Sequence, residues 1–317
     1  MTKFASTLFL IVFGFSLAVL AENPDQKTDL GDEGNKFVAT EFASYTQLHP
    51  QGQCKSSGTG TPVIITGFGL FEGVSYNISG TVVQALAGQR PAAVKISSAD
   101  HGAKVYNNLI TVNGRKYDAC LIIADVIWDL AATIINFEAK QYKPRMILMT
   151  GRGSSTASYE AGGINYAVSK PGYDSNGNPL SDPTGHTNIP KQSWIVNSMI
   201  PGQIIAFNWN AKKLARASES TIASLGYEVV GQSGPREDNN YLCNNIGFIT
   251  SYYSAGNNVT LAGDKITLYS PDYVYSPVVG FFHFPTVDFD HPDLSSYKSG
   301  IQGWGTVLLN TVDAALN

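Results

Sequence analysis

The residue best suited to chemistry is Cys243, which follows Asn239 and Asn240 and precedes an apolar run. Asparagine is a favoured N-cap residue, because its side chain accepts a hydrogen bond from an unpaired N–H of the first helical turn. A helix that begins there would place Cys243 where the helix dipole favours the thiolate, which is a good nucleophile. Cys243 is therefore a candidate nucleophile, although a small apolar core residue is the commoner use of a cysteine in such a segment.

Two further residues are candidates to assist a thiolate. Glu160 lies shortly after the turn 151–153, whose glycines lack the spacing of a phosphate-binding loop. A lone glutamate in a loop is usually a solvated charge. His283 stands inside the apolar run 278–285, where an imidazole needs a hydrogen-bond partner. That partner is either a backbone carbonyl, as for an ordinary core histidine, or a catalytic group.

The three cysteines, Cys54, Cys120 and Cys243, cannot all pair within one chain. One arrangement joins Cys54 to Cys120 and leaves Cys243 reduced, whereas in the other Cys120 is simply a buried residue of a strand-like run. No two cysteines have the spacing of metal ligands, and the five histidines are dispersed. We therefore expect no metal site and no cofactor.

The segment 1–21 is typical of a secretory signal peptide. It has one positive charge at Lys3, then an apolar run, and small residues before the expected cleavage site after Ala21. An uncleaved membrane anchor is the alternative, but the apolar run is short for one and lacks a charged stop-transfer flank. We expect a secreted protein without membrane contact after the signal is cleaved.

The rest of the chain divides into a polar extension over 22–60, expected to be a surface wrap or a disordered arm, and one large domain over 61–317. The 317 residues are 43% hydrophobic and 15% charged, with a net charge of −4. Lysines and arginines are scattered, so neither nucleic acid nor an acidic membrane is an expected partner. The sequence does not indicate an oligomeric state.

Segments with the patterns of strands and helices alternate from Thr61 onwards. Short β-branched runs predict strands, and apolar residues at helical spacing predict helices. Their alternation predicts an α/β fold with a mostly parallel sheet, in which ligands bind at the loops beyond the strand carboxyl ends. The expected strands are 62–68, 92–98, 118–127, 145–150, 227–232 and 278–285, and the expected helices are 79–87, 129–142, 206–224, one around Cys243, and 301–316.

Five segments together resemble the pyroglutamyl peptidase I family, cysteine peptidases that remove an N-terminal pyroglutamyl residue from peptides. The resemblance covers most of 61–317, and the order Glu, Cys, His is its most specific feature. It implies a three-layer α/β/α sandwich with a mostly parallel central sheet. The five segments are GFGLFEG at 67–73, EAGGIN at 160–165, DSNGNP at 174–179, YLCN at 241–244 and GFFHFP at 280–285.

The resemblance implies a Cys-His-Glu triad. Cys243 would be the nucleophile, His283 would exchange protons with it and with the leaving amine, and Glu160 would orient the imidazole. A pyroglutamyl peptide would be the substrate. Phe68 and Phe71 would pack against the lactam ring, Asn77 would bond to it, Arg152 would stand about where the family has a pocket glutamine, and Tyr241 and Leu242 would complete the pocket wall.

The chain departs from the family pattern at several places. The residues 238–240 replace Ala-Gly-Thr before the nucleophile motif, and the substrate loop has Leu70 and Glu72 in place of a proline and a glycine. Ala161 and Lys170 stand where the family has arginines, and 255–270 looks like an insertion. A signal peptide is also unusual for this family.

Two glycosylation sequons begin at Asn77 and Asn258. We expect Asn77 to face the pocket unmodified and Asn258 to be the acceptor. The sequence thus predicts a secreted cysteine peptidase acting on pyroglutamyl peptides. The alternatives are a secreted, catalytically inactive protein that binds peptides or partners on the same scaffold, and a cysteine hydrolase with a different acyl specificity.

Overall fold

A computed structural model describes residues 28–71, 76–180, 188–234, 241–270, 276–286 and 294–317. The expected signal peptide over 1–21 and the altered residues 238–240 lie outside these ranges. Within the described ranges, no helix combines the length and apolar character needed to cross a bilayer.

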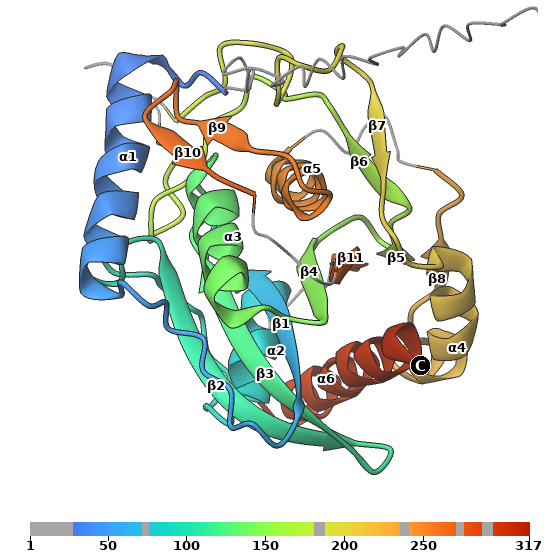
Figure 1. The fold of residues 1–317 in the computed structure, drawn as a ribbon. Helices are drawn as coiled ribbons and strands as arrows, with labels where there is room; N and C mark the ends of the chain where they lie inside the picture. Colours follow the sequence, from blue (N-terminus) through green and yellow to red (C-terminus); the bar gives the residue numbers. More distant parts are fainter. Residues whose placement is uncertain (1–27, 72–75, 181–187, 235–240, 271–275, 287–293) are drawn as a thin grey trace, which may run out of the picture.

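A seven-stranded sheet forms the centre of the molecule (Figure 1). Neighbouring strands pair in parallel at β1/β3, β1/β4, β4/β11 and β5/β8, and antiparallel at β2/β3 and β11/β5. The sheet is therefore mostly parallel, as predicted. Its order is β2 (Ala103–Val112), β3 (Arg115–Ala124), β1 (Thr61–Phe68), β4 (Met146–Arg152), β11 (Val278–Phe284), β5 (Ala157–Tyr159) and β8 (Val229–Gly231).

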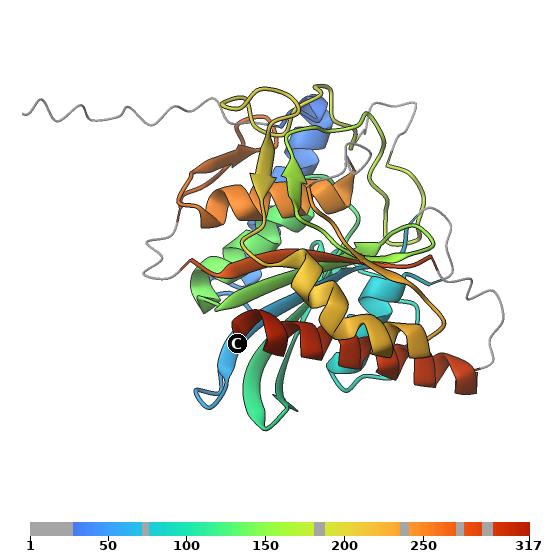
Figure 2. The same ribbon diagram turned by 90° about the vertical axis from the view of Figure 1, so that its right-hand side faces the viewer.

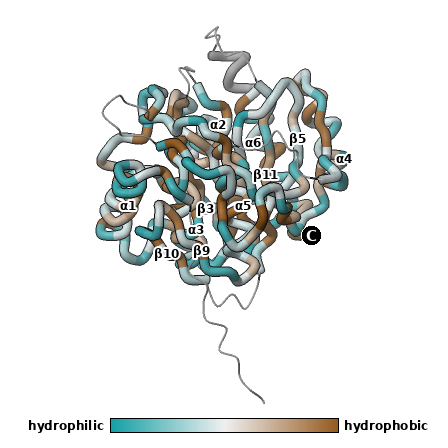
Figure 3. Tube along the Cα trace, turned by 90° about the horizontal axis from the view of Figure 1, so that it is seen from above, coloured by the Kyte–Doolittle hydropathy of each residue, from teal (hydrophilic) through white to brown (hydrophobic). Residues whose placement is uncertain are grey.

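Helices cover both faces of the sheet, which makes the three-layer α/β/α sandwich that was expected (Figure 2). Apolar side chains of the two sheet faces pack under these helices in two separate cores. The apolar stretches follow the central strands and the helices on them (Figure 3). One face carries α3 (Leu130–Tyr142) and α5 (Leu242–Ser254), and the other carries α2 (Ile78–Leu86), α4 (Ala211–Ser224) and α6 (Leu294–Leu316).

Of the two alternatives for 22–60, the disordered arm was wrong for the described residues 28–60, which form an ordered cover on the surface of the domain. Residues Gly31–Leu48 form helix α1, which packs against α3. The buried carboxylate of Glu138 on α3 holds this segment, because it accepts hydrogen bonds from the Tyr45 hydroxyl at 2.7 Å and the Cys54 N–H at 2.8 Å. A single carboxylate far along the chain thus stabilises the helix, and the sequence of 22–60 alone has no strong helical pattern.

Cys54 and Cys120 form a disulfide, with their Cα atoms 5.3 Å apart, and Cys243 is free. The bridge ties the end of the extension to β3. Of the two arrangements considered for Cys120, the structure therefore has the paired one, and the sulfur is also fully buried.

Three of the expected elements differ most from the structure: the strand 92–98, the helix 206–224, and the helix 301–316, which begins earlier, at Leu294. The residues 92–98 form no strand, and the edge strand β2 over Ala103–Val112 lies beside β3 instead. Strand β2 is buried only at its two ends and elsewhere has half-buried and exposed residues, which a search for buried apolar runs does not detect. The predicted helix over 206–224 begins at Ala211, because the Asn210 side chain caps it by accepting from the Lys213 N–H at 2.9 Å.

The insertion over 255–270 folds as a small hairpin of β9 (Val259–Leu261) and β10 (Ile266–Leu268). A separate two-stranded antiparallel sheet pairs β6 (Gly162–Ile164) with β7 (Ile204–Ala206), which lie far apart in the chain, and a 3₁₀ turn spans Ser98–Asp100. The buried Asp129 carboxylate accepts from the Ala262 N–H at 2.9 Å and also from the Thr28 hydroxyl. The insertion is therefore bound to the same face of the sheet as α1 and α3.

Candidate active site

Cys243 is the second residue of α5, the helix that lies across the carboxyl end of β4. A helix does begin at this place, but its N-cap is Tyr241, whose side chain makes no capping hydrogen bond. The N-cap role predicted for the asparagines was therefore wrong for the helix start that the structure has, and Asn239 and Asn240 themselves lie outside the described residues. The first intrahelical bond runs from the Asn245 N–H to the Tyr241 carbonyl, so the N–H groups of 242–244 precede the helical ladder.

Asn244 anchors the start of this helix. Its side-chain oxygen accepts from the Ile164 N–H at 2.8 Å, and its amide donates to the carbonyls of Ile164 at 2.8 Å and Tyr166 at 3.0 Å. These three bonds fix the residue next to Cys243 to strand β6. Asn244 was part of the sequence motif, but the motif gave no reason to assign it this positioning role.

His283 lies near the end of β11, beside Gly151 of β4. Its Nδ1 is 2.6 Å from Oε1 of Glu160, and its side chain also hydrogen-bonds the Cys243 thiol. Because Nδ1 faces the carboxylate, Nε2 is the nitrogen available to the sulfur. The three candidate residues, which lie up to 123 positions apart in the sequence, thus form one continuous Cys-His-Glu chain of contacts.

Glu160 follows β5 and is only 1% exposed, so it is not the solvated loop charge that a lone glutamate would be. Two hydrogen bonds fix the backbone of Glu160. Its N–H donates to the Phe281 carbonyl at 3.0 Å, and its carbonyl accepts from the Trp209 indole N–H at 2.6 Å. The Trp209 ring lies over Gly280 of β11. Because Glu160 and His283 are held on neighbouring strands, the carboxylate can orient the imidazole.

Burial shifts the pKa of His283 downwards, but the charge of Glu160 and the contact with Cys243 outweigh it and raise the pKa from 6.5 to about 10. The imidazole is therefore protonated at neutral pH. A cation beside a thiol favours the thiolate.

Glycines give the triad its space. A Cβ on Gly153 would lie 2.9 Å from the Cβ of His283, closer than real Cβ contacts. A Cβ on Gly151 would likewise lie too close to the Cys243 sulfur. Both glycines belong to the turn that looked like a weak phosphate motif, and their role here is to let the imidazole and the sulfur approach the sheet.

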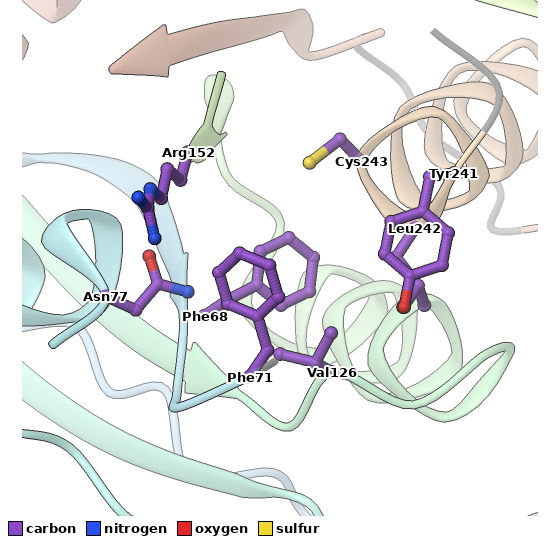
Figure 4. A pocket seen from close by; sticks show the side chains of 8 residues that line it. All are labelled: Phe68, Phe71, Asn77, Val126, Arg152, Tyr241, Leu242 and Cys243. Carbon is purple, nitrogen blue, oxygen red and sulfur yellow. The ribbon is translucent and has the colours of Figure 1, made fainter. Parts of the chain in front are cut away.

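A pocket opens beside the Cys243 sulfur (Figure 4). The six residues proposed for substrate binding all line it, together with Val126, which the sequence did not single out. No acidic side chain is among these described lining residues. Phe68 ends β1 and Arg152 ends β4, so the pocket lies at the carboxyl edge of the parallel strands, as ligand sites of open α/β sheets do. The lining residues are Phe68, Phe71, Asn77, Val126, Arg152, Tyr241, Leu242 and Cys243.

Asn77 and Arg152 face each other at the end of the pocket opposite Cys243 (Figure 4). Asn77 is 3% exposed and caps α2: its oxygen accepts from the Ser79 N–H at 3.2 Å, and its amide donates to the Gly69 carbonyl at 2.8 Å. The amide of Asn77 is thus held in place before any ligand binds. Among the described residues, no carboxylate or hydrogen-bond acceptor pairs with the Arg152 guanidinium.

The arrangement contains the parts needed for acyl transfer: a nucleophile, a base with its orienting carboxylate, N–H groups at a helix start that precede the helical ladder, and an adjoining pocket. In the described part of the chain, no group of three or more histidine, cysteine, aspartate or glutamate side chains is placed to hold a metal ion.

No protein-family model matches this chain, and no curated protein matches it either. Among solved structures, it is similar to a mutant pyrrolidone carboxyl peptidase from the hyperthermophile Pyrococcus furiosus, at 15% identity and a TM-score of 0.49, over 81% of this chain and 98% of that one. It is also similar to pyroglutamyl peptidase I from Bacillus amyloliquefaciens, at 14% identity and a TM-score of 0.49, over 81% and 95%. Similarity at this level does not indicate a shared activity, so the function proposed below rests on the geometry of the site.

Proposed function

We propose that this protein is a cysteine peptidase that hydrolyses the bond after an N-terminal pyroglutamyl residue. The observation that carries the proposal is the position of His283, whose imidazole contacts the Glu160 carboxylate on one side and the Cys243 thiol on the other. Catalytic cysteines need a base within hydrogen-bond reach that is itself oriented by a third group.

In the first half-reaction, the Cys243 thiolate attacks the pyroglutamyl carbonyl carbon. The carbon–nitrogen bond then breaks, and protonated His283 gives its proton to the leaving amine of the shortened peptide. The product is a thioester on Cys243. Glu160 stays ionised throughout and stabilises the imidazole while it is charged.

In the second half-reaction, a water molecule gives a proton to neutral His283 and attacks the thioester carbon. The carbon–sulfur bond breaks, which releases pyroglutamate and restores the thiolate–imidazolium pair. The N–H groups of 242–244 lie at the positive end of α5, where they are suited to stabilise the oxyanion of both tetrahedral intermediates.

The residues that line the pocket favour a substrate with an N-terminal pyroglutamyl group over one with a free N-terminal amino group. An ordinary N-terminal residue carries an ammonium, and none of the described lining residues is an acid that could pair with it. A lactam has no such charge. Its flat ring suits the faces of Phe68 and Phe71, and its polar edge suits the Asn77 amide and the Arg152 guanidinium at the far end.

The disulfide between Cys54 and Cys120 supports an expectation of the sequence, namely that the protein works outside the cytosol. We therefore place the proposed activity in a secreted protein. The alternative of an inactive binding protein would be supported by a pocket filled by Glu72 or Asp238, and both residues lie outside the described ranges. The pairing of His283 favours the enzyme.

The test is release of a fluorogenic amine from a pyroglutamyl amide by the purified protein, in mild reductant that leaves the disulfide intact. Activity that is absent in Cys243→Ala and in His283→Ala, with both variants folded, would support the proposal. The proposal would be wrong if the folded wild-type protein released no amine from this substrate.

A further inference from the structure

Arg152 is the unexplained feature of the pocket. It is the last residue of β4 and follows Gly151, which lies against the Cys243 sulfur. Because side chains alternate along a strand, Arg152 points to the opposite side of the sheet edge, toward Asn77 (Figure 4). It therefore occupies the end of the pocket remote from the nucleophile.

The guanidinium of Arg152 has five donors, and within the described chain it has neither an ion-pair partner nor a hydrogen-bond acceptor. A half-buried charge at the end of a largely apolar pocket loses part of its hydration. It regains that free energy when a ligand supplies a carboxylate, with which a guanidinium forms two parallel hydrogen bonds. A neutral lactam carbonyl has no charge with which to compensate it.

The surroundings of Arg152 also favour an anion. The N-terminus of the nine-residue helix α2 is at Asn77, and the positive end of its dipole lies at this end of the pocket. The described lining has no acidic side chain that would repel a carboxylate. The guanidinium and the helix start act on the same region, and the aromatic rings of Phe68 and Phe71 lie between that region and Cys243 (Figure 4).

We propose that the pocket binds acyl groups whose far end is a carboxylate, held by Arg152, so that the enzyme also cleaves amides of short dicarboxylic acids such as glutaric acid. This inference uses the nucleophile of the proposed function and extends its substrate class. Cys243 attacks the amide carbonyl of the glutaryl group, and the amine leaves with a proton from His283. Water then hydrolyses the thioester to glutarate, and the distal carboxylate remains on Arg152 throughout.

The experiment uses two fluorogenic amides that differ only in charge: a glutaryl amide and its isostere in which the distal carboxylate is a carboxamide. We expect the wild-type protein to prefer the glutaryl amide in kcat/KM by about 10- to 100-fold, as for a hydrogen bond to a charged group. The preference should disappear in Arg152→Gln and be reduced in Arg152→Lys, which keeps the charge but not the two parallel donors. Arg216→Gln, an exposed change on α4 across the sheet, is the matched control and should keep it.

A second readout does not need turnover. Iodoacetate and iodoacetamide both alkylate a thiolate, and only iodoacetate carries a carboxylate. The ratio of their alkylation rates at Cys243, followed by mass spectrometry, should fall at least about fivefold in Arg152→Gln relative to wild type and Arg216→Gln, since one nearby charge is removed. Wild type and both variants carry the same charge at His283, so this charge does not affect the comparison of their alkylation ratios.

The possible outcomes separate this inference from the proposed function. Cleavage of the pyroglutamyl amide without a preference for the glutaryl amide, or with a preference that survives in Arg152→Gln, would overturn the inference and leave the peptidase standing. If no amide is cleaved, the peptidase is wrong, and the alkylation ratio alone decides whether the charge of Arg152 favours an anion in the pocket. A ratio that does not depend on Arg152 would overturn the inference.

Discussion

Gly151 and the sulfur of Cys243 touch across the edge of β4: a Cβ on Gly151 would lie 2.6 Å from Sγ and 3.1 Å from the ring of Phe281. Both distances are shorter than real Cβ contacts allow comfortably, and the Phe281 ring is fully buried. The Cys243 thiol therefore packs directly against the backbone of Gly151, which has no side chain. This contact fixes how deep the sulfur lies relative to His283, which occupies the neighbouring strand.

Gly151→Ala should therefore impair catalysis more than folding. The methyl group would push the sulfur away from His283, and a displacement of about 1 Å can cost about 100-fold in rate. We expect kcat/KM for the pyroglutamyl amide to fall by about that factor, measured beside Gly300→Ala, a helical position in α6 with open space around it. Equal activities of the two variants would show that the contact does not position the thiol.

Glu160→Gln should shift the pH dependence of activity. The pKa of His283 is raised to about 10 largely by the charge of Glu160, and the imidazole must be protonated to donate to the leaving amine. Wild-type kcat/KM should therefore persist at alkaline pH and fall only as the pH approaches about 10. In the variant this alkaline limb should move to lower pH, with kcat reduced by about 100-fold or more. An unmoved limb would mean that Glu160 does not control the imidazole.

The ion pair between His283 and Glu160 should also make the free energy of unfolding depend on pH in a known direction. A histidine whose pKa is higher in the folded protein than in the unfolded chain contributes stability that is complete below about pH 6.5 and is lost as the pH rises to about 10. The difference in free energy of unfolding between wild type and Glu160→Gln should therefore shrink between pH 7 and pH 10. Urea titrations at both pH values measure it, and a difference that grows would contradict the ion pair.

The disulfide should stabilise the fold without entering the chemistry. It closes a loop between residues 66 apart and ties the N-terminal extension to β3. The double variant Cys54→Ser with Cys120→Ser should lose about 2–4 kcal/mol of unfolding free energy. Its activity well below the melting temperature should stay within about threefold of wild type, because neither sulfur lines the pocket. Cys243→Ala is the opposite control, with the disulfide intact and no activity.

The two sequons should differ in occupancy when the protein is secreted by a glycosylating host. The Asn77 amide is buried and donates to the Gly69 carbonyl, so a glycan there is incompatible with the fold. Asn258, at the edge of the β9–β10 hairpin, is half-buried. Glycopeptide mapping of active protein should find Asn77 unmodified and Asn258 as the occupied site. A glycan on Asn77 in active protein would exclude the pocket described here.

Much of the architecture could be predicted from local patterns. The buried strands β1, β3, β4 and β11 are continuous apolar runs, and α3 has a clear apolar repeat, so their existence and the mostly parallel sheet followed from the sequence. The failures share one cause. Strand β2 and helix α1 depend on partners far along the chain, β3 for one and Glu138 for the other, and local periodicity does not encode such partners.

The sequence by itself determined the chemistry that was available: at least one cysteine without a partner in the chain by parity, an imidazole inside an apolar strand, a glutamate in a loop, and the order in which they occur. Only the tertiary structure decided that Glu160 is buried beside His283, that Gly151 leaves room for the sulfur and that Arg152 faces a pocket whose described lining residues include no acid. The physical reason is that residue types and spacings set what each segment can form. Burial, charge pairing and the pKa of His283 arise only when strands distant in the chain pack side by side.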